Sequence, residues 1–171
     1  MSGVQRRTPD VSPTCALRVG LIADTHNLLR NQALTALAGC DHIVHAGDIC
    51  RPEVLLRLAE QAPLTAVRGN NDKGEWADAL APSEWLQLGG ITLHVLHDRA
   101  DLDIDPVAAG VDVVVTGHSH RPLIERRDGV LWVNPGSAGP RRFRLPVTLA
   151  ELRIEAGKVD ARLIELDPDR A

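Results

Sequence analysis

Three apolar runs in the first half of the chain, each ending in polar residues, are the feature that most constrains its fold. They are LRVGLIAD (17–24), DHIVHAGD (41–48) and LTAVRGN (64–70). Between them, LLRNQALTALAG (28–39) has helical spacing and a terminal glycine, and RPEVLLRLAE (51–60) has a proline near its first turn. Apolar strands that alternate with helices predict parallel βα units.

The second half of the chain predicts antiparallel hairpins instead. EWLQLGGITLHVLH (84–97) turns at Gly-Gly, LIERRDGVLWV (123–133) at Asp-Gly, and TLAELRIEAGKVDARLIEL (148–166) at Ala-Gly. A further apolar run, VDVVV (111–115), is followed after Thr-Gly by His-Ser-His. Together these elements predict an α/β fold of mixed sheets with helices outside.

The composition is that of one ordinary globular domain. Of the 171 residues, 44% are hydrophobic and 25% are charged, which is enough for a substantial core. Residues 1–16 contain no apolar run of signal-peptide length, so we expect a flexible N-terminal tail followed by a single domain at 17–171. No later segment approaches membrane-spanning length.

Two further features of the composition bear on function. Aromatic residues are scarce and the formal net charge is -4, so nucleic-acid binding is not indicated. The three cysteines, Cys15, Cys40 and Cys50, lack Cys-x-x-Cys spacing, which predicts reduced thiols and a cytoplasmic location. We expect Cys40 and Cys50 to lie in the core.

Polar side chains follow five of the predicted strands, at the point where each strand ends. They are Asp24 and His26, Asp48, Asn70, His97, and His118 with His120. Open α/β sheets place their ligands at the carboxyl ends of the strands, so we expect these five strand ends to converge on one site.

The chemistry of these side chains suits two adjacent divalent cations. The spacing of two residues in Asp24-x-His26 and His118-x-His120 lets both side chains of a pair face one ion, or lets a turn divide them between two ions. A carboxylate such as Asp48 has two oxygens and can bridge a metal pair. Carboxylate, amide and imidazole ligands favour Mn, Fe, Zn, Co or Ni over Mg or Ca alone.

The order of these motifs, D-x-H, GD, GN-x-D, H and GH-x-H, resembles that of the calcineurin-like metallophosphoesterases. RGNND and NPGSAGPRR resemble the small YfcE-like phosphodiesterase branch, and the resemblance spans roughly residues 19–166. It implies a four-layer αββα sandwich of two mixed β-sheets flanked by helices.

The resemblance also implies which residues bind metal and take part in catalysis. It places Asp24, His26 and His120 on one metal, Asn70, His97 and His118 on the other, and Asp48 as the bridge. The catalytic residues that it implies are Asp48, Asn70, Asn71, His97 and His118. We therefore expect hydrolysis of a small phosphoester, most readily a phosphodiester, by a water that two divalent transition-metal ions activate. Mn is the expected metal, and a homodimer or homotetramer is the expected assembly.

The sequence departs from this family pattern at three positions. Asn27 replaces a usual glycine, which asparagine can imitate because it tolerates the left-handed conformation. Asp98 follows His97 where many relatives have Gly-His. Asn71 stands where many larger relatives have a histidine, and an amide hydrogen-bonds but cannot protonate a leaving group.

Several other polar residues are predicted to have structural roles. We expect His42 and His94 to be exposed or half-buried strand residues, and Asp72 to hold its loop. His45 is predicted to orient a metal ligand through a hydrogen bond. Arg68 is placed to face either phosphate or an acidic surface partner, while Arg141, Arg142 and Arg144 are predicted to form a solvated or salt-bridged cluster.

Two other kinds of protein share part of this pattern. The small subunit of the retromer coat resembles this fold, lacks a histidine at the Asn71 position and serves as a protein-binding scaffold, so a metal-binding scaffold with little turnover is the alternative. The complete set of predicted ligands favours an enzyme. The metallo-β-lactamase-like hydrolases require His-x-His-x-Asp-His, and Arg121-Pro122 after His120 excludes that pattern.

Overall fold

The strands of the protein form two five-stranded mixed sheets, as a computed structural model that describes residues 16–169 shows. The strands are β1 (Leu17–Ile22), β2 (His42–His45), β3 (Leu64–Ala66), β4 (Ser83–Leu88), β5 (Ile91–Leu96), β6 (Val113–Val115), β7 (Leu123–Arg127), β8 (Val130–Asn134), β9 (Val147–Glu155) and β10 (Lys158–Leu166). The helices are α1 (Asn31–Leu37), α2 (Pro52–Ala59) and α3 (Glu75–Asp78), and a 3₁₀ turn, η1, spans Arg99–Asp101. Apart from Ala16, the predicted tail at 1–16 lies outside the described residues.

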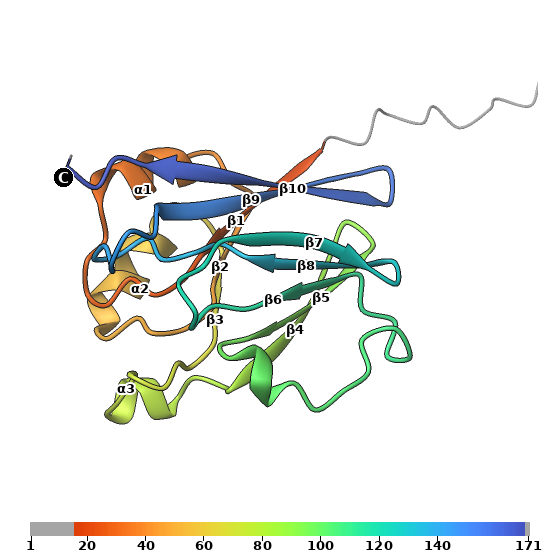
Figure 1. Ribbon diagram of the computed structural model, residues 1–171, viewed down its shortest axis with the longest axis horizontal. Helices are drawn as coiled ribbons and strands as arrows, with labels where there is room; N and C mark the ends of the chain where they lie inside the picture. The colour runs from red at the N-terminus through yellow and green to blue at the C-terminus, as the bar shows by residue number, and fades with distance from the viewer. Residues whose placement is uncertain (1–15, 170–171) are drawn as a thin grey trace, which may run out of the picture.

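Each sheet combines parallel and antiparallel strands. The first sheet has the order β10-β9-β1-β2-β3, with β1, β2 and β3 parallel and the β9–β10 hairpin added antiparallel to β1. The second has the order β4-β5-β6-β8-β7, with β5, β6 and β8 parallel and antiparallel strands at both edges. In Figure 1, β10, β9 and β1 lie above the strands of the second sheet, and α1 and α2 lie at the left.

Alternation of side chains along the strands divides the core into layers. Val19 and Leu21 of β1 and Val113 and Val115 of β6 point into the apolar layer between the sheets. The neighbouring side chain Ile22 packs instead in the layer beneath α1 and α2. These layers confirm an α/β sandwich of two mixed sheets, the predicted fold class.

The outer face of the second sheet is covered differently from that of the first. Val114 of β6 packs there with Leu96, Val111 and Val130, and Leu102 and Ile104 close this small cluster. The covering segment therefore consists of η1 and the loop after it rather than an α-helix. The sandwich has α-helices packed on one outer face and a 3₁₀ turn with loop on the other.

Most predicted elements are present, with shorter bounds. The three predicted hairpins form at their Gly-Gly, Asp-Gly and Ala-Gly turns, while the helix predicted at 28–39 covers only Asn31–Leu37. Arg30 is extended and buried, and its guanidinium donates to the carbonyl oxygens of Gly139 and Pro168. That tertiary contact holds residue 30 outside the helix. The short α3 was not predicted.

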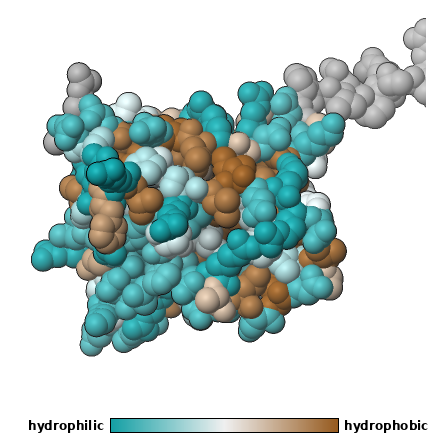
Figure 2. Space-filling model, viewed as in Figure 1, coloured by the Kyte–Doolittle hydropathy of each residue, from teal (hydrophilic) through white to brown (hydrophobic). Residues whose placement is uncertain are grey.

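The surface visible in Figure 2 is mostly hydrophilic, with a brown area over the region where the first sheet lies above β7 in Figure 1. Exposed apolar side chains include Leu123 and Ile124 of β7 and Leu163 of β10. Within the described residues, no helix is both long and apolar enough to cross a membrane.

Candidate metal centre

The seven predicted ligands lie together at the carboxyl ends of five strands. The first sheet carries Asp24 and His26 after β1, Asp48 after β2 and Asn70 after β3; the second carries His97 after β5 and His118 and His120 after β6. Five of the seven have a positive φ, namely Asp24, His26, Asp48, His118 and His120. Non-glycine residues adopt that conformation at a cost of roughly 1–3 kcal/mol and concentrate at functional sites.

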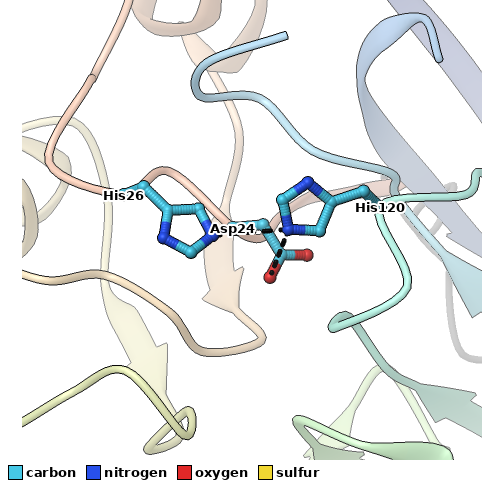
Figure 3. A group of neighbouring side chains, drawn as sticks. All are labelled: Asp24, His26 and His120. Atoms are coloured by element: carbon cyan, nitrogen blue, oxygen red, sulfur yellow. Dashed lines mark hydrogen bonds and ion pairs between the residues drawn. The ribbon is translucent and has the colours of Figure 1, made fainter. Parts of the chain in front are cut away.

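Asp24, His26 and His120 form the first group of side chains. Figure 3 shows the three pointing toward one another from two segments that are distant in sequence. The Nε2 atoms of His26 and His120 are 3.3 Å apart, and His120 Nε2 lies 3.5 Å from Asp24 Oδ1. The other carboxylate oxygen, Oδ2, accepts a hydrogen bond from the backbone N–H of His118 at 3.1 Å.

Asn70, His97 and His118 form the second group. The Asn70 Oδ1 atom lies 2.9 Å from His97 Nε2 and 3.1 Å from His118 Nδ1, so one amide oxygen contacts both rings. His97 Nδ1 donates to the carbonyl oxygen of Ala46 at 2.7 Å, which directs Nε2 toward the site.

Asp48 lies between the two groups. Its Oδ2 is 3.6 Å from His26 Nε2 and its Oδ1 is 3.4 Å from His97 Nε2. Asn71 donates to both oxygens, from its backbone N–H to Oδ1 at 2.9 Å and from its side-chain Nδ2 to Oδ2 at 2.8 Å. The carboxylate is thus oriented with one oxygen toward each group.

Asp72 holds the backbone beneath Asp48. Its two carboxylate oxygens accept hydrogen bonds from the N–H groups of Asp48, Ile49, Cys50 and Gly69, at 2.7 to 3.0 Å. The residue was expected to hold its own loop, and it also fastens that loop to the one after β2.

Gly69 and Gly117 permit the close approach of these loops. A Cβ on Gly69 would meet the backbone and carboxylate of Asp48, and one on Gly117 would contact the Asp24 carboxylate. A side chain at either position would therefore displace a predicted ligand.

Burial and neighbouring charges shift the pKa values of the site in opposite directions. Burial raises the pKa of Asp24 to about 7, and it lowers the pKa of His120 to about 4 with help from Arg142. Burial would also raise the pKa of Asp48, but hydrogen bonds from His97 and Asn71 hold that pKa below its ordinary range. Burial lowers the pKa of His97, but hydrogen bonds with Asp48 and the Ala46 carbonyl and the negative charges of Asp48 and Asp24 together raise that pKa above its ordinary value.

The residues present fit a pair of cations. Asp24 Oδ1 is buried without a hydrogen-bond partner among the described residues, and it faces an imidazole nitrogen. Imidazole and carboxylate atoms of Asp24, His26 and His120 lie within 4.8 Å of one another, as do those of Asp24, Asp48 and His97. Two imidazole nitrogens beside a carboxylate are a donor set suited to Mn, Fe, Zn, Co or Ni.

The other histidines lie only partly where the sequence predicts them. His42 contacts the Thr65 hydroxyl at 2.8 Å, away from the site, as expected of a structural residue. His94 is buried rather than half-buried, packs against Trp85 with the two rings tilted, and lines a cavity beside the second group. His45 accepts from the Gly47 N–H and contacts the Thr25 hydroxyl, so it orients the backbone beside the predicted ligands rather than a ligand itself.

Cys50 and Arg142 differ from the prediction, whereas Arg68 takes one of the two roles predicted for it. Cys40 is in the core, but Cys50 lies in the site loop with its Sγ 3.5 Å from His26 Nδ1, because a left-handed φ of 72° turns it out of the core. Arg68 pairs with the Asp78 carboxylate at 2.9 Å. Arg142 reaches His26, with its Nη2 3.4 Å from Nε2. Sequence reasoning missed the contacts of Cys50 and Arg142, which join loops far apart in the chain.

Known proteins resemble this chain in sequence and in fold. The sequence profile of the calcineurin-like phosphoesterase superfamily domain matches residues 17–157. The chain belongs to this superfamily. A probable metallophosphoesterase of Methanocaldococcus jannaschii is 32% identical to this phosphoesterase-superfamily chain over 163 residues, covering 87% of this chain and 81% of the relative.

Solved structures show the same fold for this phosphoesterase domain. An archaeal phosphodiesterase superposes with a TM-score of 0.75 at 23% identity, covering 88% of this chain and 100% of the other. Vacuolar Protein Sorting 29 of Cryptosporidium parvum superposes with a TM-score of 0.71 at 18% identity, covering 88% and 98%. At such identities the likeness establishes the fold.

Proposed function

We propose that this calcineurin-like phosphoesterase hydrolyses a small phosphodiester with two divalent transition-metal ions, of which Mn is the expected one. The observation that carries the proposal is the position of Asp48, whose two oxygens face the two groups of ligands. A carboxylate oriented in this way is suited to bridge a metal pair. The similarity to an archaeal phosphodiesterase supports the choice of diester.

Each group of side chains would hold one ion. Asp24, His26 and His120 would bind the first ion, Asn70, His97 and His118 would bind the second, and Asp48 would bridge them. When bound, such a pair of ions supplies Lewis-acid activation of the phosphate and of the attacking water.

The protein's own residues position these ligands and define the cleft. Asp72 and Asn71 fix the Asp48 carboxylate, and the Ala46 carbonyl fixes His97. A cavity of about 350 Å³ opens beside the second group, with Asn70, His97 and His118 in its wall. This volume suits a small phosphoester. The two buried carboxylates offset only half the charge of two divalent ions, so the loaded site would attract a phosphate anion.

The environment of Asn71 bears on which leaving groups the protein can release. Its side-chain amide is engaged with Asp48, and an amide has no proton to give at neutral pH. Turnover should therefore be best with leaving groups that depart readily as anions, such as nitrophenolate.

The alternative is a metal-binding protein-interaction scaffold with little or no turnover. The fold likeness to Vacuolar Protein Sorting 29 favours this alternative, because a protein named for protein sorting has the same fold. The enzyme and the scaffold would both bind metal, but only the enzyme would turn over substrate, so metal binding and turnover must both be measured.

The test compares Asp48→Asn with the wild-type protein after removal of metal and reloading with Mn²⁺. The substitution removes a negative charge from between the two groups, so we expect loss of bound metal. Turnover of bis-p-nitrophenyl phosphate should fall by more than about 100-fold, because losing a direct ligand exceeds the roughly 10- to 100-fold cost of losing an outer partner. Elemental analysis and absorbance at the nitrophenolate band are the measurements.

Asp160→Asn is the matched control, because this substitution makes the same chemical change at an exposed residue of β10. It should keep wild-type metal content and turnover. Full metal occupancy in Asp48→Asn would remove Asp48 from the role of bridge. Wild-type protein that binds two Mn²⁺ ions without turnover above a chelated control would support the scaffold instead.

A further inference from the structure

The loop between β8 and β9, residues 135–146, is fixed against the first group of ligands. The Ser137 hydroxyl donates to the backbone oxygen of Asp24 at 2.9 Å. The buried Arg30 guanidinium donates to the oxygen of Gly139 at 3.1 Å, which anchors the loop where it leaves the site. The three arginines that follow are therefore carried by a loop with a fixed base.

Arg142 is the arginine of this loop that reaches the ligands. Its Nη2 atom lies 3.4 Å from His26 Nε2, the nitrogen that also faces His120 and Asp48. Arg141 and Arg144 are exposed and make no hydrogen bond or ion pair with any other described residue. The loop thus aims one guanidinium at the first group.

The Arg142 guanidinium and a metal ion bound to His26 would compete for one nitrogen, because Arg142 Nη2 contacts His26 Nε2. A guanidinium has five N–H donors and no acceptor. It cannot share His26 Nε2 with a metal ion, because both are cations that need the same lone pair.

An anion resolves this conflict. A guanidinium beside a pair of divalent cations is stable when a group with several negatively charged oxygens lies between them, and phosphate has that form. We propose that Arg142 binds a non-bridging oxygen of the phosphoryl group in substrate and product, on the side of the first metal ion. This inference rests on the proposed function, and it names the residue that recognises phosphate there.

The test measures phosphate binding separately from turnover. Isothermal titration of inorganic phosphate into Mn²⁺-loaded protein should give an affinity about 10- to 100-fold weaker for Arg142→Gln than for wild type, the range for a lost charge-assisted hydrogen bond. Arg142→Lys should lie between them, because it keeps the charge and loses the two-pronged geometry. Arg141→Gln and Arg144→Gln, which remove the same charge from the same loop, should match the wild type.

Turnover then separates this inference from the proposed function. In an active wild type, Arg142→Gln should raise KM for bis-p-nitrophenyl phosphate and weaken inhibition by phosphate, with metal content unchanged. Wild type without turnover but with Arg142-dependent phosphate binding would refute the proposed function and leave the inference standing.

Two results would overturn the inference itself. Equal phosphate affinities for Arg142→Gln and Arg141→Gln would mean that Arg142 adds only diffuse charge. Tighter metal binding in Arg142→Gln with unchanged phosphate affinity would mean that Arg142 merely competes with metal for His26.

Discussion

At the scale of single residues, Asp24 has the most unusual environment in the site. It is fully buried, one of its oxygens has no hydrogen-bond partner among the described residues, and burial raises its pKa from 3.8 to about 7. A buried carboxyl prefers to be neutral in the metal-free protein. Asp24 should stabilise the protein when a cation is bound, since a cation favours the charged form of the carboxyl group.

This environment predicts a pH-dependent stability difference for Asp24→Asn in metal-free protein. Because the folded-state pKa is raised, the contribution of protonated Asp24 to stability is fully present below about pH 4 and is lost as the pH rises through about 7. The amide stays neutral, so the variant should gain stability relative to wild type between about pH 5 and about pH 8, by at most about 3 kcal/mol. Urea unfolding in EDTA at both pH values measures the difference.

Mn²⁺ should make the wild type more stable than Asp24→Asn, because only the wild-type carboxylate has a negative charge that attracts the cation. Asp160→Asn, an exposed site, should show no pH-dependent difference from wild type. A stability difference between Asp24→Asn and wild type that is the same at both pH values would contradict the raised pKa of Asp24.

The sequence predicts which residues occupy the strand ends, and less about what they touch. Asp24, Asp48 and His97 stand out because polar side chains end apolar runs. The contacts of Cys50 and Arg142 with His26 depend on positive φ angles and on loops separated by 24 and 116 residues. No local pattern of apolar and polar residues records such contacts.

At the scale of elements, the segment between β8 and β9 supports the one after β1. Ala138 donates its backbone N–H to the oxygen of Ala23 at 3.1 Å, and Ser137 donates its hydroxyl to Asp24. A Cβ on Gly139 would meet the backbone oxygens of Asp24 and Thr25. The first group therefore depends on a glycine in a different element.

We predict that Gly139→Ala displaces the Asp24 segment. The added methyl group should lower stability by about 1–3 kcal/mol, as overpacking does. Metal affinity should fall about 10- to 100-fold, as for loss of an outer support. Chemical unfolding and Mn²⁺ titration check the two effects.

Gly110→Ala is the control for a glycine substitution that lowers stability without pressing on the site. Its Cβ would meet nothing, but its φ of 73° is unfavourable for alanine, so it should cost about 1 kcal/mol of stability with no change in metal affinity. If Gly139→Ala behaved in the same way, the close packing of the two segments would have no bearing on metal binding.

The predictability of the elements follows from where their stabilising contacts lie. The hairpins are specified by turn residues within a few positions, so sequence finds them. The helix start at Asn31 is set by tertiary contacts of Arg30, and the covering of the second sheet by η1 is set by a small apolar cluster. The start of the helix and the covering of the sheet both depend on contacts with distant parts of the chain. The contacts of Arg30 make the helix shorter than predicted.

At the scale of the whole molecule, the arrangement of the strands is the part least contained in local sequence. β8 lies in a predicted hairpin with β7, but it also pairs in parallel with β6. That pairing continues a parallel row from β5 through β6 to β8, in which the pairing of β5 with β6 places the end of β6, with its two histidines, beside the end of β5. The resemblance to the family predicted the stacking of the sheets, whereas periodicity alone predicted only that they are mixed.

The proposed ligands come from both sheets, so metal binding should stabilise the sandwich as a unit. At free Mn²⁺ near 100 times the dissociation constant, mass action adds about 2.7 kcal/mol, which corresponds to a rise of about 5–10 °C in Tm for a chain of this size. Hydrogen exchange should slow in the segments after β1, β2 and β3 and also in those after β5 and β6. Thermal unfolding and exchange mass spectrometry, with and without Mn²⁺, provide the measurements, and Asp48→Asn should show neither effect. Protection confined to the first sheet would mean that His97, His118 and His120 do not bind the ions, since ligands from one sheet cannot hold the other in place.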